Sequence, residues 1–282
     1  MILSNIVHIR TYYISTLLLF INLLSTSLFG QSYDFTDYSY KPDKQYIKSY
    51  WTATKKIATG PFHWKKNEWK IAGGVVVIGA ALYIFDDDIR SIFQSNQNNT
   101  LDFASKYIFE PLGSGIYPAL LFGGYYVYGL TAKNTKARQI ALGGTQAFLM
   151  AAVSVQVLKN VFHRHRPYQD SPPNPYLWEG PFGDWAYTAF PSGHTTAAFA
   201  IATFMASVYK DKPWIGVVSY GLATGVALSR VYDNMHWSSD VFIGAALGFA
   251  VGQTVYKIMN KDSNFSMGIS DNGGIAIAYK IE

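Results

Sequence analysis

Residues 195–228 read TTAAFAIATFMASVY, KDKP and WIGVVSYGLATGVAL, which are two apolar stretches joined by a four-residue link. Both stretches are rich in Ala, Gly, Val and Leu and contain no charged side chain, so they predict two helices. The link is short and basic, as expected of a cytoplasmic turn if the two helices span a membrane. This part of the sequence therefore predicts a pair of neighbouring apolar helices.

Four more stretches of the same kind extend this pattern along the chain. They are Ile71–Phe85, Leu112–Leu130, Ile140–Leu158 and Val241–Tyr256. Small residues such as Gly244, Gly248 and Gly252 would let the helices pack closely. Several stretches hold only 15 or 16 apolar residues, whereas a bilayer span needs roughly 20. The predicted fold class is all-α, a helical bundle of about six apolar helices that form either a membrane domain or the core of a soluble one.

Composition narrows the function classes. The chain has 282 residues, which suits one domain, and 49% are hydrophobic while 15% are charged. The formal net charge of +5 is spread among apolar stretches, so nothing favours a nucleic-acid partner, and no obligate protein partner is indicated. The absence of cysteine excludes disulfides, thiolate metal sites and cysteine nucleophiles.

The two ends of the chain differ from the middle. Residues 1–30 resemble a signal peptide or an uncleaved amino-terminal anchor, because Arg10 precedes an apolar run. Residues 31–70 hold eight lysines against four acids and predict a surface-lying lead-in to a helical domain at 71–259. The tail, 260–282, contains Asn272-Gly-Gly, which predicts a small β-hairpin whose second strand is Ile275–Tyr279.

Three polar patches lie where apolar helices meet loops. They are Lys159-(six residues)-Arg166-Pro167, Pro191-Ser192-Gly193-His194 and Ser229-Arg230-(five residues)-His236-(three residues)-Asp240. Charged residues at the ends of buried helices are costly unless they are paired or used in function. The patches are therefore the predicted functional site.

The cations of these patches suit a phosphate group. The guanidinium groups of Arg166 and Arg230 and the ammonium group of Lys159 can bind the oxygens of a phosphate dianion and neutralise its charge. Ser192 and Gly193 come just before a predicted helix, whose N–H groups and dipole would add an anion-binding site. These five residues are the predicted phosphate-binding set.

The histidines supply a nucleophile and an acid. His236 and Asp240 are four residues apart, so on a helix the carboxylate could hold the imidazole Nδ1–H and leave Nε2 free to attack. His194 would protonate the leaving oxygen and later deprotonate water. His236, Asp240 and His194 are therefore the predicted catalytic residues.

Taken together, the three patterns resemble the signature of the type-2 phosphatidic acid phosphatase and vanadium haloperoxidase superfamily, in the same order and with the same spacings. The resemblance covers about Ile71–Met259. It implies a helical bundle, a phosphohistidine on His236, and catalysis without a metal or other cofactor. The expected activity is hydrolysis of phosphate monoesters, with a lipid phosphate or an isoprenoid diphosphate as substrate. Vanadate would act as an inhibitor.

Several alternatives stay open. Within the superfamily, a haloperoxidase would hold vanadate as its cofactor, and a soluble periplasmic acid phosphatase would need no membrane. Zinc binding by His194, His236 and Asp240 is disfavoured by the three nearby cations. A serine hydrolase that uses Ser192 is disfavoured by the lack of a Gly-x-Ser-x-Gly motif. His163 and His165 are predicted to lie in a solvated basic loop. The aromatic loop Asn160–Ser192 is predicted to be a lid or substrate wall, or else simple packing over the end of the bundle.

The predicted location is the cell envelope. Basic turns at 132–138 and 210–213 favour the cytoplasmic side, which would place the site on the outer face of the cytoplasmic membrane. A cleaved signal followed by six spans would place it inside. Either one stretch does not span, in the first place Ile71–Phe85, or the amino-terminal run is not a simple signal, or the bundle is soluble in the periplasm.

Overall fold

The computed structural model describes residues 40–260 and two strands at 265–269 and 275–279. All of these residues lie in the second of the two units into which the chain divides, 38–282. The predicted signal or anchor segment, 1–30, lies outside the described residues. So does the first part of the predicted lead-in, 31–39.

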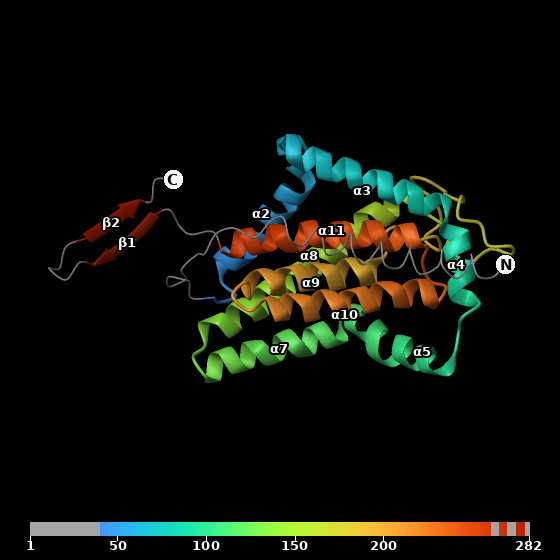
Figure 1. The fold of residues 1–282 in the computed structure, drawn as a ribbon. Helices are drawn as coiled ribbons and strands as arrows, with labels where there is room; N and C mark the ends of the chain where they lie inside the picture. Colours follow the sequence, from blue (N-terminus) through green and yellow to red (C-terminus); the bar gives the residue numbers. More distant parts are fainter. Residues whose placement is uncertain (1–39, 261–264, 270–274, 280–282) are drawn as a thin grey trace. The chain divides into compact units, whose positions relative to one another are not determined.

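All six predicted apolar stretches form helices, which confirms the all-α prediction (Figure 1). Their bounds are α3 (Lys66–Ile84), α7 (Ile116–Thr131), α8 (Thr135–Phe162), α9 (Gly193–Val208), α10 (Pro213–Tyr232) and α11 (Ser238–Met259). The helix α8 is longer than its apolar stretch because Asn134 caps it, accepting a hydrogen bond from the N–H of Ala137. The helix α7 starts late, at Ile116, after Gly115 with its positive φ of 99°.

The helix α9 lies at the centre of the bundle and packs against α8, α10 and α11. Its contact with α11 is close because α11 turns glycines toward it. A Cβ atom at Gly248 or Gly252 would collide with the backbone carbonyl groups of Thr196 and Ala200. The predicted role of these small residues in packing is confirmed.

Three described helices, α8, α10 and α11, are long and apolar enough to cross a membrane, by length and composition alone. A fourth candidate is the pair formed by α3 and α4 (Asp86–Gln94), which is bent by 60°. Exposed apolar side chains lie on α3, α7 and α10, among them Val76, Leu120 and Val217. These features identify the chain as a membrane protein.

Other elements were not predicted. The lead-in contains the helix α2 (Lys44–Thr59), and its Tyr46 hydroxyl donates to the carbonyl oxygen of Leu142 at 3.0 Å. The lead-in therefore packs on the bundle, although its lysines are exposed. Between α4 and α7 lie α5 (Asn99–Ala104), the π-helical η2 (Ser105–Phe109) and α6 (Glu110–Gly113), and after α2 comes the 3-10 helix η1 (Gly60–His63).

The two strands, β1 (Phe265–Ile269) and β2 (Ile275–Tyr279), pair antiparallel, and β2 has the predicted bounds.

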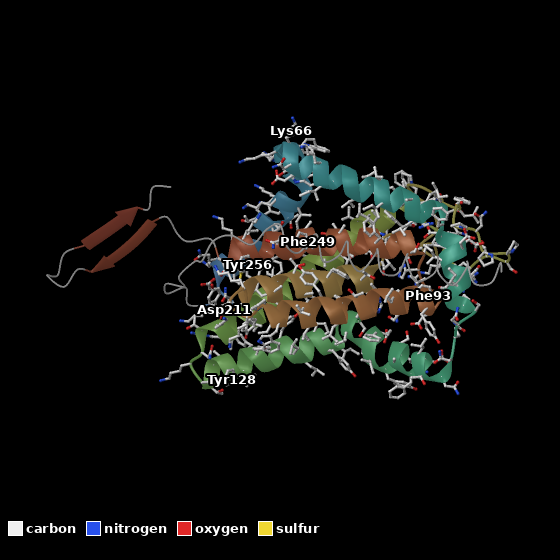
Figure 2. The ribbon with its side chains drawn as sticks, viewed as in Figure 1. Lys66, Phe93, Tyr128, Asp211, Phe249 and Tyr256 are labelled. Atoms are coloured by element: carbon white, nitrogen blue, oxygen red, sulfur yellow. The ribbon has the colours of Figure 1, made fainter. Side chains whose placement is uncertain are left out.

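The bundle has two chemically different ends. At one end the link between α9 and α10 lies beside the start of α8, where Lys136 Nζ is 3.9 Å from Asp211. At the other end α8 and α10 finish and α9 and α11 begin, so this end receives all three polar patches. Figure 2 shows Asp211 and Tyr256 at the first end and Phe93 of α4 at the second.

Candidate active site

The three polar patches meet at this second end of the bundle. The backbone N–H of Ser192, which precedes α9, donates to the carbonyl oxygen of Asp240 in α11 at 3.1 Å. The backbone N–H of His236 donates to the carbonyl oxygen of Arg230 at 3.2 Å. The Nζ atom of Lys159 lies 4.0 Å from the point that a Cβ at Gly193 would occupy.

The three cations differ in how they are engaged. A guanidinium nitrogen of Arg166 donates to Thr188 Oγ1 at 3.1 Å, and Arg230 forms an ion pair with Asp233 at 2.6 Å. The ammonium group of Lys159 has no hydrogen-bond or ion-pair partner among the described residues. Lys159 and Arg166 repel one another, as do Arg166 and Arg230. An anion bound among them would relieve this repulsion.

The start of α9 offers backbone donors, and the N–H of Gly193 is one of those predicted. The N–H of Ser192 is already used by Asp240, and its hydroxyl oxygen accepts a hydrogen bond from Thr195 Oγ1 at 3.0 Å. The N–H groups of Gly193 and His194, in the first turn of α9, have no partner within the helix. These two groups are therefore the available anion donors.

His236 is held differently from the prediction. Its Nδ1 lies 2.7 Å from the carbonyl oxygen of Ala189, whereas the nearest oxygen of Asp240 is 3.8 Å away. The prediction assumed that both residues lie on one helix, but α11 begins only at Ser238. A carbonyl can only accept, so Nδ1 carries the proton and Nε2 is free of it. Burial, followed by the charges of nearby cations, lowers the pKa of His236 to about 4.

Asp240 serves another contact instead. One carboxylate oxygen accepts the backbone N–H of Trp237 at 2.9 Å, and the other accepts from a guanidinium nitrogen of Arg164 at 2.5 Å. A second guanidinium nitrogen of Arg164 bonds Asp86 at 2.8 Å, and all three side chains are fully buried. Asp86 in turn accepts the N–H of Ser239 at 2.9 Å.

Arg164 is a candidate site residue that the sequence prediction missed. Two hydrogen bonds link Arg164 to His236 through the peptide of Ala189. The N–H of Ala189 donates to the carbonyl oxygen of Arg164 at 3.0 Å, and the carbonyl oxygen of Ala189 accepts from His236 Nδ1. Arg164 therefore supports His236 through its backbone and Asp240 through its side chain. The only sequence signal for it was a charged residue beside an apolar helix.

The two neighbours of Arg164 correct a second prediction, since neither His163 nor His165 lies in a solvated loop. Both are buried. His163 Nδ1 is 2.9 Å from the carbonyl oxygen of Gly180. The ring of His165 stacks on Tyr187 at 3.6 Å. They fix the conformation of the loop.

His194 occupies the second position of α9, beside a residue that the sequence did not single out. Its Nε2 lies 3.4 Å from a carboxylate oxygen of Glu110 in α6. Burial and the charge of Arg230 lower the pKa of His194, while Glu110 acts in the opposite direction. In the described part of the chain, no three His, Asp or Glu side chains are grouped as metal ligands.

Comparison with known proteins matches the part of the chain that carries the three polar patches. Residues 141–264 match the profile of the PAP2 superfamily. A 74-residue stretch is 45% identical to part of the lipid A 1-phosphatase of Porphyromonas gingivalis. This stretch covers 26% of this chain and 17% of that protein. Over 130 residues the chain is 33% identical to the decaprenylphosphoryl-5-phosphoribose phosphatase of Mycobacterium tuberculosis. That alignment covers 46% of this chain and 67% of the other protein.

The chain spans 58% and 60% of the length of two further curated relatives. Among solved structures, the transmembrane PAP2 type phosphatidylglycerolphosphate phosphatase from Bacillus subtilis is 19% identical, with a TM-score of 0.46. That alignment covers 79% of this chain and 100% of the other.

Proposed function

Because this chain belongs to the PAP2 superfamily, we propose that it is a metal-independent phosphatase that hydrolyses phosphate monoesters through a phosphohistidine on His236. The observation that carries this proposal is the hydrogen bond from Nδ1 of His236 to Ala189, because it leaves Nε2 unprotonated and nucleophilic. Lys159 and Arg166 are close enough to depress the pKa of His236, so they can hold the phosphate beside it.

The reaction then proceeds in two displacements. Nε2 of His236 attacks phosphorus, the bond to the ester oxygen breaks, and the His194 imidazolium gives that oxygen its proton. His194, now neutral, takes a proton from water as the water oxygen attacks the phosphohistidine and releases inorganic phosphate. The cations and the N–H groups of α9 stabilise the charge of each transition state.

The proposed substrate is a lipid phosphate or an isoprenoid diphosphate. The relatives named above include a lipid A phosphatase and a phosphatase of a decaprenyl-linked sugar phosphate. The exposed apolar faces of α3, α7 and α10 would place the site at the bilayer surface, within reach of such a headgroup.

The proposed location of the site is the outer face of the cytoplasmic membrane. The opposite end of the bundle carries the basic links at 132–138 and 210–213 and the lysines of α2, a distribution that favours the cytoplasmic side. Because α3 and α4 together are a candidate span, this location does not rest on α3 failing to span. It requires instead that residues 1–30 are not a cleaved signal.

The test is phosphate release by the purified full chain in detergent. Phosphatidic acid and an isoprenoid diphosphate are compared with glycerol phosphate and an aryl phosphate. The proposal predicts higher kcat/KM for the lipids. Equal or better efficiency on glycerol phosphate would favour a broad-specificity acid phosphatase, and halide oxidation after vanadate loading would favour a haloperoxidase.

A further inference from the structure

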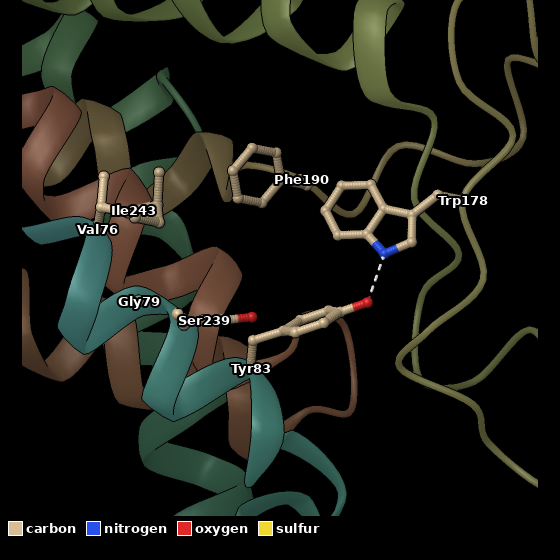
Figure 3. Close-up of a pocket in the computed structure, with 8 residues that line it drawn as sticks. Val76, Gly79, Tyr83, Trp178, Phe190, Ser239 and Ile243 are labelled. Carbon is tan, nitrogen blue, oxygen red and sulfur yellow. Dashed lines mark hydrogen bonds between the residues drawn. The ribbon is translucent and has the colours of Figure 1, made fainter.

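An apolar groove of about 270 Å³ runs between α3, α11 and the aromatic loop (Figure 3). Ala80 and Tyr83 line it from α3, Trp178 and Phe190 from the loop, and Ile243 from α11. The indole N–H of Trp178 donates to the hydroxyl of Tyr83 at 3.0 Å, which fixes the loop against the helix. The loop therefore forms one wall of the groove.

On three elements, residues that line or contact this groove are close in sequence to candidate site residues. Phe190 precedes Ser192 by two residues, so their Cα atoms are at most about 7 Å apart. Ser239, which also lines the groove, is the neighbour of Asp240. The ring of Phe162, one helical turn beyond Lys159, meets the ring of Phe190 with centroids 5.1 Å apart.

The outer side of the groove continues into the exposed face of α3. Val76, which lines the groove, is 65% exposed, and its neighbour Val77 is 68% exposed. In a membrane protein such a face lies against acyl chains, so a chain can enter the groove without crossing a polar barrier.

We propose that the groove binds an alkyl or prenyl chain of the lipid whose phosphate reacts at His236. This inference rests on the proposed phosphatase function and adds a binding subsite to it. The chain would replace the bilayer as the neighbour of the groove's apolar side chains.

The same rings connect the groove to the catalytic residues. The guanidinium carbon of Arg164 lies 4.9 Å from the ring centroid of Tyr83 and 4.8 Å from that of Trp178. A chain that packs on these two rings therefore stabilises the side chain that holds Asp240. Binding energy from a remote part of the substrate can in this way support the reacting geometry.

The test compares Ala80→Trp, which fills the groove from an exposed position, with Val77→Trp, which adds the same ring outside it. Monoalkyl phosphates of 4, 8, 12 and 16 carbons and an aryl phosphate are assayed in one detergent. For the wild type and for Val77→Trp, kcat/KM should rise with chain length. For Ala80→Trp, the increase in kcat/KM from the shortest to the longest alkyl phosphate should be smaller by roughly tenfold or more. Its turnover of the aryl phosphate should be unchanged.

The other outcomes separate the possibilities. If Ala80→Trp keeps the wild-type dependence on chain length, or if Val77→Trp loses it equally, the groove is not the subsite. If Ala80→Trp lowers Tm and lowers the rates on all substrates by the same factor, the groove matters for stability and not for chain binding, and the inference is overturned. If the wild type releases no phosphate from any substrate, the proposed function itself fails.

Discussion

His236 donates its Nδ1 proton to the carbonyl oxygen of Ala189, 2.7 Å away. The peptide of Ala189 is held in turn by Arg164, whose carbonyl oxygen accepts the Ala189 N–H at 3.0 Å. A backbone carbonyl cannot be protonated near neutral pH, so this arrangement fixes the imidazole tautomer whatever the state of Asp240. His236 is therefore oriented by the loop that precedes α9.

The two histidines should respond differently to substitution. His236→Ala should abolish phosphate release from every substrate, because each reaction needs the nucleophile. His194→Ala should retain a measurable fraction with an aryl phosphate, whose leaving group needs no proton, and far less with an alkyl phosphate. Initial rates of the two variants on both substrates provide the measurement. Undiminished turnover by His236→Ala would exclude the proposed mechanism.

Arg164→Met should destabilise the protein by about 3–5 kcal/mol, because it leaves the buried carboxylates of Asp86 and Asp240 without a counter-ion. Lys136→Met is the control. It removes a partly exposed ion pair of 3.9 Å and should cost less than about 1 kcal/mol. Unfolding in detergent gives both values.

The double variant Arg164→Met, Asp86→Asn should recover part of the lost stability, because it removes one of the two unpaired charges. If Arg164→Met is no more destabilising than Lys136→Met, the buried ion pairs do not support the site.

Activity on alkyl phosphates should show an acidic optimum. His236 must be neutral to attack, and its pKa is lowered to about 4, so kcat/KM should fall as the pH drops through about 4. His194 must be protonated to act as an acid, and its pKa lies below the usual 6.5, so kcat/KM should also fall as the pH rises past that lowered value. The pH profile of His194→Ala should lack the alkaline decline. An unchanged decline in that variant would assign the acid to another residue.

Chelators should leave the rate unchanged, and vanadate should inhibit at low concentration. Five-coordinate vanadate resembles the in-line transition state, so Lys159, Arg166 and Arg230 should bind it better than they bind phosphate. Arg166→Ala should weaken inhibition by vanadate more than inhibition by phosphate. Inactivation by EDTA that zinc or magnesium reverses would contradict metal independence.

Much of this architecture was predictable from the chain itself. The apolar stretches predicted all six main helices, and the spacing of the three patches predicted which ends would meet. What escaped prediction depends on tertiary contacts. Asp86 and Arg164 are 78 positions apart and become partners only when α4 packs against the loop. Asp240 was predicted to hold His236 because the two are four residues apart. The spacing does not reveal that α11 begins at Ser238, between them, so that they do not share a helix.

The most direct test of the account is to trap the covalent intermediate. Wild-type protein is mixed with a substrate labelled at phosphorus, quenched in denaturant at alkaline pH within one turnover, and mapped by peptide sequencing. The account predicts an acid-labile, alkali-stable phosphate on His236, more abundant in His194→Ala, where attack by water is slower. Full turnover of the substrate with no label on His236, or with the label on another residue, would contradict it.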